Sequence, residues 1–357
     1  MRVLELPHGW SPFAWGHHHG QAFCHEIHEL AAIRLQLAVE FGSFRGEQEV
    51  LEIAARHLPV LEEFDLDLHA ELTGIAEGAG LSAAEVVVLN HYTDLRDLGL
   101  NGYSPPEDGC SAVFSRQAQR SLLGQTWDMH GSAMRYVIML KVPASDLEGG
   151  LRPAAWLFTV VGCLGMAGLN SSGVGVTINN ITCVDARVGL VWPAVVRGML
   201  RERSAQAARE VLDASSLGSG HHYLVADSHC AYGIEITGSA RQVVYDGSES
   251  AFVHTNHCID SRLQTCTRIS PASTTFERHD KLVGQLNARP ICTLSDLWQL
   301  LGSHDGYPRS VCTHLVSPVE PHAMATCGGL AMDLSRRELW TQHGCLNHAR
   351  PARFGFD

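Results

Sequence analysis

The chain has 357 residues, a formal net charge of −12 and 18% charged against 45% hydrophobic residues. This composition is typical of a compact folded protein and excludes a disordered one. The negative charge, with no run of Lys or Arg, argues against nucleic acid or an anionic membrane as partner.

The cysteines and the N-terminal residues bear on the compartment. The 11 cysteines include no Cys-x-x-Cys pair, so neither a disulfide framework nor a zinc ribbon is indicated. The start of the sequence has no apolar leader, and no stretch approaches the roughly 18 apolar residues of a membrane span. We therefore expect a cytoplasmic protein with reduced thiols. No motif calls for a cofactor, and we expect none.

The first hundred residues are predicted to be helical. Apolar residues recur at helical spacing over 23–41, 49–58 and 60–78. Ser82 with Glu85 predicts a capping box at the start of another helix. After Tyr92, glycines and prolines predict an exposed connector over 93–107, which would suit a processing site.

The next stretch, 108–128, is predicted to be a β-hairpin, because two apolar runs flank a polar turn. Its first strand begins at Cys110, preceded by Gly109, which tolerates a strained backbone and leaves its carbonyl open to attack. This pattern predicts self-cleavage, in which Cys110 attacks the Gly109 carbonyl and becomes a new N-terminus. Its α-amine, with a pKa of about 8, would then serve as base for its own thiol, with Asp128 beside it. The alternative is a buried cysteine in an ordinary hairpin.

Strands predominate beyond the hairpin. Helices and strands follow without βαβ alternation, which predicts an α+β fold, and we favour a four-layer αββα sandwich with two antiparallel sheets. The expected strands are 136–142, 155–161, 222–237, 241–246 and 251–254, with hairpins at 168–180 and 324–343. The expected helices are 193–215, 274–286 and 294–301, the last capped by Thr293 and Asp296.

Several short motifs, each weak alone, occur in an order that is specific. They are Pro12-Phe13, His19-Gly20, 74–79, Leu89-Asn90, Asp108-Gly109-Cys110, 124–128, 170–173 with Asn179, 253–258, Arg278-His279, Tyr307-Pro308 and 310–312. Over nearly its whole length the chain thus resembles the isopenicillin N acyltransferase family of N-terminal nucleophile (Ntn) hydrolases. The resemblance implies an Ntn sandwich that cleaves itself into 1–109 and 110–357, two fragments of one folded unit and of a possible homo-oligomer.

The resemblance also implies site roles. Cys110 would be the nucleophile, Asp128 the group beside its α-amine, and Asn256 an oxyanion-hole amide, since a tetrahedral oxyanion needs a fixed neutral donor. Further candidates for contacts to substrate or oxyanion are Asn179, Thr255, His257 and Asn170. The alternative for the asparagines is a turn residue that bonds its own backbone.

One position departs from the family pattern. Relatives often carry an arginine directly after the equivalent of Cys312, whereas this chain has Thr313, with Arg309 three residues before Cys312. We therefore expect hydrolysis of a linear N-acyl amide through an acyl thioester on Cys110. The alternative is acyl-CoA-dependent transfer to a small amine.

Two hypotheses outside this chemistry stay open. Histidines are frequent over 17–28, and His18, His25 and His28 share a helical face by spacing, which would suit a metal-binding protein. Imidazole binds zinc, copper and nickel, although the His-Glu-x-x-His pattern of metalloproteases is missing. The other hypothesis is an uncleaved, non-catalytic protein with an inert Cys110.

Overall fold

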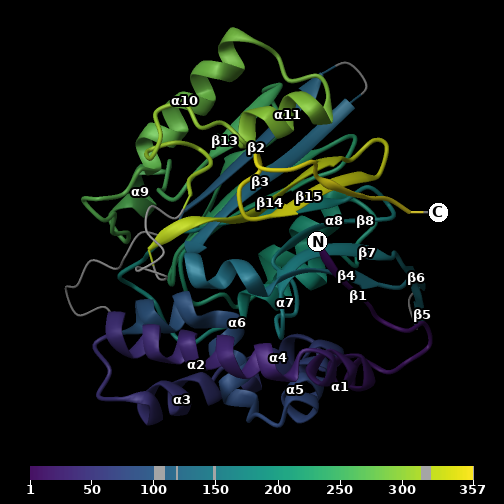
Figure 1. Ribbon diagram of the computed structural model, residues 1–357, viewed down its shortest axis with the longest axis vertical. Helices are drawn as coiled ribbons and strands as arrows, with labels where there is room; N and C mark the ends of the chain where they lie inside the picture. The colour runs from purple at the N-terminus through teal and green to yellow at the C-terminus, as the bar shows by residue number, and fades with distance from the viewer. Residues whose placement is uncertain (100–108, 118–119, 148–149, 315–322, 357) are drawn as a thin grey trace.

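The computed structural model describes residues 1–99, 109–117, 120–147, 150–314 and 323–356 (Figure 1). Two large sheets form the centre. The eight-stranded sheet has the order β1 (Arg2–Glu5), β4 (Val137–Val142), β7 (Ala155–Val160), β8 (Ala167–Asn170), β9 (Gly175–Asn180), β10 (His221–Ala226), β11 (Ala231–Ile236) and β12 (Arg241–Tyr245). The six-stranded sheet has the order β13 (Ala251–His254), β2 (Gly109–Gln117), β3 (Arg120–His130), β14 (Met324–Asp333), β15 (Glu338–His343) and β16 (Ala352–Phe354). A small ribbon pairs β5 (Ser145–Leu147) with β6 (Gly150–Arg152).

Helices cover both outer faces of the sheets (Figure 1). Against the six-stranded sheet pack α10 (Thr275–Ala288) and α11 (Leu294–Leu301). On the far side of the eight-stranded sheet lie α1 (Pro12–Ala22), α2 (Cys24–Phe41), α3 (Glu47–Ala55), α4 (Leu58–Phe64), α5 (Leu66–Ala79), α6 (Ala83–Leu98), α7 (Trp192–Met199) and α8 (Ala205–Ala214). Shorter helical turns are η1 (Gly131–Tyr136) and α9 (Ser261–Gln264).

The layer order confirms the predicted αββα sandwich. The two sheets face each other where β9 contacts β2 and β3. Alternating side chains of both inner faces can be buried there while the outer faces are covered by helices. The pairing of neighbouring strands is antiparallel, except that β1 pairs parallel with β4, so the eight-stranded sheet is mixed at that edge.

One hydrophobic core includes residues from before and after Gly109. Asn90 of α6 fixes the turn after β7, because its Nδ2 donates to the Gly162 carbonyl at 2.9 Å and its Oδ1 accepts from the Leu164 amide at 2.9 Å. His19 of α1 accepts from the Gly162 amide at 2.9 Å. The N-terminal helices therefore form part of the same folded body as the strands.

Polar caps divide some of the longer predicted elements. The helix expected over 60–78 is two helices, since Asp65 accepts from the Leu68 amide at 2.8 Å and begins α5. Ser204 likewise begins α8 and divides the helix expected over 193–215. The strand expected over 222–237 is a hairpin, turned by Asp227, which accepts from the amides of His229 and Cys230. Hydrophobic patterning alone overlooked these local side-chain bonds.

The first residues of the connector expected over 93–107 are helical instead. Helix α6 continues to Leu98, and its last turns are buried because Asp94 contacts His221 and Asp97 accepts from the Cys183 amide at 3.1 Å. Residues 100–108 lie outside the described residues. No single helix of the described chain has the length and apolar composition to cross a membrane; α5 and α6 meet that test only together, with a bend of 114°.

Candidate active site

Cys110 lies near the start of β2, where the strand faces the other sheet, and is 5% exposed. Its cross-strand partner on β3 is Trp127, and the preceding Gly109 pairs with Asp128. The Cys110 backbone is held from the side opposite β3: its N–H donates to Asn256 Oδ1 at 2.8 Å, and its carbonyl accepts from Arg278 Nη1 at 2.8 Å. The predicted hairpin is confirmed, and both backbone polar groups of the proposed nucleophile are fixed by side chains.

Asn256 follows the end of β13, the edge strand beside β2. Its backbone N–H donates to Thr275 Oγ1 at 2.8 Å, which ties the loop to the start of α10. Its side-chain oxygen faces Cys110 N–H, and its Nδ2 donates to the Asn180 carbonyl at 2.8 Å. One hydrogen of Nδ2 is thus used on Asn180. In this chain Asn256 is foremost an acceptor for the Cys110 nitrogen.

Arg278 of α10 is a site residue that sequence reasoning did not name as one. Its guanidinium is 1% exposed and donates to the Cys110 carbonyl, to Ser111 Oγ at 2.9 Å and to Asn256 Oδ1 at 2.9 Å. Its Nε donates to Thr274 Oγ1 at 3.0 Å. The planar fork of arginine suits such a multiple contact. The signal was present, because Arg278-His279 is one of the motifs of the resemblance.

Asp128 is 1% exposed and lies directly across from Gly109. Neither of its carboxylate oxygens has a hydrogen-bond partner of regular geometry among the described residues. Burial raises the pKa of Asp128 to about 6, although Arg278 and then Thr326 favour the charged form. A carboxyl group with this pKa can both take up and release a proton near neutral pH.

The structure gives a different reason for Gly109 than the one expected. Its φ is not among the positive ones, so no left-handed strain is present there. Instead, a Cβ at position 109 would lie 2.8 Å from Asp128 Oδ2 and 3.0 Å from Asp128 Cβ. A glycine suits this position because the Asp128 carboxylate approaches the backbone there and would be crowded by a Cβ.

A cavity of about 40 Å³ adjoins Cys110 and Asp128 between the sheets and α6. This volume holds a few water molecules at most. His221 lies in its wall, oriented by Asp94, whose carboxylate oxygens both lie 3.0 Å from His221 Nε2. The other wall residues are mostly apolar or aromatic, and they include Tyr92, Trp127, Met129, Phe158, Met166, Ile178 and Trp192.

The further candidates from the sequence lie elsewhere. Asn179 points away from this cavity and contacts His222 Nδ1 at 2.9 Å, whereas its neighbour Asn180 lines the cavity. This follows from the alternation of side chains along β9. Asn170 Oδ1 accepts from the amides of the tight turn that follows it, and Thr255 bonds the Thr275 carbonyl at 3.1 Å.

Three other predicted features also have structural contacts. His257 contacts Thr275 Oγ1 at 2.9 Å and helps fix the loop that carries Asn256. Arg309 forms a surface ion pair with Glu277 at 2.7 Å and does not turn toward Cys110. The N-terminal histidines do not share one helix: His18 belongs to α1, whereas His25 and His28 belong to α2.

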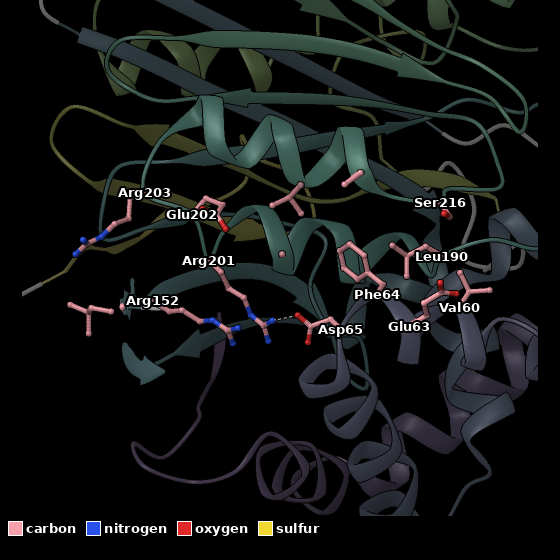
Figure 2. Close-up of a pocket in the computed structure, with 15 residues that line it drawn as sticks. Val60, Glu63, Phe64, Asp65, Arg152, Leu190, Arg201, Glu202, Arg203 and Ser216 are labelled. Carbon is pink, nitrogen blue, oxygen red and sulfur yellow. Dashed lines mark hydrogen bonds and ion pairs between the residues drawn. The ribbon is translucent and has the colours of Figure 1, made fainter. Parts of the chain in front are cut away.

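A larger surface pocket, of about 680 Å³, lies between α4, α7 and α8 and the β5–β6 ribbon (Figure 2). Figure 2 shows Arg201 and Asp65 joined as an ion pair on its wall, with Arg152 beside them. Its described wall contains no cysteine and none of the residues around Cys110. This pocket is therefore separate from the residues that surround Cys110.

Comparisons with known proteins give the family. The family described as acyl-coenzyme A:6-aminopenicillanic acid acyl-transferase matches residues 115–321, a range that includes Asp128, Asn256 and Arg278 and begins five residues after Cys110. A curated relative, the 40 kDa form of acyl-coenzyme A:6-aminopenicillanic-acid-acyltransferase of Emericella nidulans, is 27% identical over 315 residues, covering 87% of this chain and 84% of the relative.

Solved structures of low identity also match. A mutant of conjugated bile acid hydrolase from Clostridium perfringens has 11% identity and a TM-score of 0.47, covering 70% of this chain and 97% of its own. Penicillin V acylase from Agrobacterium tumefaciens has 10% identity and a TM-score of 0.45, covering 70% and 86%. The sequence match spans more than half of the chain, and the chain therefore belongs to the acyl-coenzyme A:6-aminopenicillanic acid acyl-transferase family.

Proposed function

We propose that this protein is a self-cleaving amidohydrolase with an N-terminal cysteine, acting on linear N-acyl amides through an acyl thioester on Cys110. The observation that supports the proposal most is the set of side-chain contacts that hold the Cys110 backbone. Asn256 and Arg278 hold its backbone N–H and carbonyl, and a buried carboxyl group, Asp128, faces Gly109. A structural cysteine needs none of these contacts.

Self-cleavage proceeds in two steps. The Cys110 sulfur bonds to the Gly109 carbonyl carbon while the thiol proton passes to Asp128, and the C–N bond breaks as the leaving nitrogen is protonated. Water then hydrolyses the thioester, which gives a Gly109 carboxylate, a free thiol and an α-amine on Cys110. The pKa of about 6 suits Asp128 to this transfer, since its carboxylate form predominates at neutral pH.

The same contacts serve the mature enzyme. Asn256 Oδ1, which accepts from the Cys110 N–H in the intact chain, is placed to accept from the α-amine. The remaining lone pair of that neutral amine takes the thiol proton during attack on a substrate. A second N–H of Asn256 Nδ2, beyond the one donated to Asn180, is the candidate donor to the tetrahedral oxyanion.

The cavity wall bears on the substrate class. Its aromatic and aliphatic residues favour an apolar acyl group. Polar contacts can come from His221 and from the other polar residues of the wall, Arg34, Asn90, Thr93, Gln125 and Asn180. Because the cavity of the intact chain measures about 40 Å³, an acyl chain needs space that this form does not offer. We infer that the intact chain is a zymogen. Transfer of the acyl group from acyl-CoA to an amine is the second candidate, favoured by the acyltransferase name of the relative.

Intact mass and N-terminal sequencing of the purified protein test the proposal first. We expect two fragments, the second beginning at Cys110, whereas Cys110→Ala stays whole. Cys292→Ser, which changes an exposed cysteine, is the matched control and should cleave like the wild type. An intact wild-type chain after long incubation contradicts self-cleavage.

A substrate panel tests the reaction of the cleaved protein. N-acyl amides and acyl-CoA thioesters should release their acyl group to water, and Cys110→Ala should release none. Acyl transfer to added amines without release to water would instead support the second candidate.

A further inference from the structure

A cluster of three potential metal ligands lies apart from the residues that hold Cys110. It consists of His304 after α11, His314 further along the same loop, and Cys345 after β15. Their ligand atoms all lie within 4.8 Å of one another, and the described part of the chain contains no other such group of three. Cys345 Sγ is 3.2 Å from His304 Nε2 and 3.8 Å from His314 Nε2.

A second thiol lies beside this cluster without belonging to it. Cys312 Sγ lies 3.7 Å from Cys345 Sγ, and both cysteines are buried free thiols. Zinc binds sulfur at about 2.3 Å and imidazole nitrogen at about 2.0–2.1 Å in a tetrahedron. Such a tetrahedron has edges of about 3.8 Å between sulfurs and about 3.6 Å between sulfur and nitrogen. The distances from Cys345 Sγ to the two imidazole nitrogens lie near the sulfur–nitrogen edge. Cys312 Sγ is close to Cys345 Sγ but does not belong to the group of atoms that all lie within 4.8 Å of one another.

The cluster is built on a fixed loop. The Cys312 amide donates to the Ser303 carbonyl at 3.1 Å, which closes the loop that carries His304. The Asn347 amide donates to Cys345 Sγ at 3.4 Å, which orients the sulfur. His304 and His314 are half-buried, and a cavity of about 510 Å³ reaches His314 and Cys345, so an ion has a route of entry.

We propose that His304, His314 and Cys345 bind one divalent transition-metal ion, with zinc the ion that this donor set favours and the fourth position of its tetrahedron left to water. On binding, the Cys345 thiol releases its proton to solvent and the imidazoles enter neutral.

The ion would join the loop after α11 to the turn after β15. The Thr313 amide, next to Cys312, donates to Thr326 Oγ1 at 2.9 Å, and Thr326 is the cross-strand partner of Asp128. The metal would thus stabilise the segment behind the catalytic carboxyl group, while no residue of the cluster contacts Cys110 in the described contacts. Its role is structural, and the ion takes no part in the cleavage of an amide.

Cobalt(II) is the probe, added to full-length protein without a histidine tag after treatment with a chelator and a reductant. We expect one Co²⁺ per chain by elemental analysis, with thiolate-to-cobalt charge transfer and the intense visible bands of tetrahedral Co²⁺. Zn²⁺ should displace it and raise the melting temperature. These readouts need no variant, so misfolding of a mutant cannot obscure them.

Variants assign the ligands. Cys345→Ser and His304→Asn should each lower the affinity for Co²⁺ at least tenfold. Each variant should also weaken or shift the charge-transfer band. Cys292→Ser and His229→Asn change exposed residues and should leave the spectrum unchanged. A wild-type chain that binds no Co²⁺, a Cys345→Ser variant with an unchanged spectrum, or a Cys312–Cys345 disulfide in metal-free native protein overturns the proposal.

Discussion

Two buried carboxyl groups, Asp128 and Glu71, are each 1% exposed but have opposite surroundings. Glu71 of α5 forms a bidentate ion pair with Arg197 of α7, with N···O distances of 2.7 and 2.8 Å. Asp128 has no such partner among the described residues, since the nearby Arg278 directs its hydrogen bonds to Cys110, Ser111, Asn256 and Thr274. The comparison separates a buried charge that is fully paired from one that we propose takes part in proton transfer.

The largest expected effect is on the rate of self-cleavage in Asp128→Asn. Loss of the proton acceptor should slow cleavage by about 10²–10⁴-fold, the range for general acid–base catalysis. Stability should be unchanged or higher, because an unpaired buried charge is removed. Time courses of cleavage with thermal unfolding measure both. A destabilised variant that cleaves normally would place Asp128 with Glu71 as a packing residue.

Glu71→Gln should show the reverse pattern. Leaving Arg197 buried without its carboxylate should cost about 3–5 kcal/mol of folding free energy. Because Glu71 lies on α5 and not beside Cys110, the cleavage rate of the folded fraction should stay near that of the wild type. Chemical denaturation gives the stability. A stable Glu71→Gln variant with impaired cleavage would contradict the distinction.

The pH dependence provides the third test. With its pKa raised to about 6, Asp128 is protonated below that pH and cannot accept the thiol proton. The cleavage rate should fall about tenfold per unit below pH 6. The native state holds this proton while the unfolded chain has lost it, so the Asp128 contribution to stability falls as pH rises from about 4 to 6.

The contribution of the Asp128 carboxyl group is isolated by comparing the free energy of unfolding of the wild type and Asp128→Asn from about pH 4 to 6. The stability advantage of the variant should grow from about pH 4 to 6 and then level off. A cleavage profile without an inflection near pH 6 would assign the proton transfer to another group.

The smallest expected effect concerns the space beside Asp128. Gly109→Ala brings a Cβ to within 2.8 Å of Asp128 Oδ2, so we expect a loss of about 1–3 kcal/mol and slower cleavage. Gly284→Ala in α10 meets no atom within 4 Å and should gain about 0.5–1 kcal/mol. Equal effects of the two changes on stability would show that the carboxylate yields to a methyl group.

Many secondary-structure elements could be predicted from local sequence patterns. The hairpin that carries Cys110, the capping boxes at Ser82 and Thr293 and the final hairpin were all predicted, because each depends on residues close in sequence. The family also followed from the order of short motifs and is confirmed by the match over residues 115–321. Element boundaries failed where a single side chain, such as Asp65 or Ser204, begins a new helix.

The candidate site also combines residues that the sequence indicated and contacts that only the structure shows. By itself the sequence indicated the α+β fold class and the hairpin with Cys110 and Asp128, because such patterns are carried along the chain. Asn256 came from the resemblance to the family. Only the tertiary structure decided that Arg278 holds Cys110, that Asn180 and not Asn179 reaches the cavity, and that His304, His314 and Cys345 meet. These are contacts between segments far apart in sequence, whose distances and directions depend on how the layers pack.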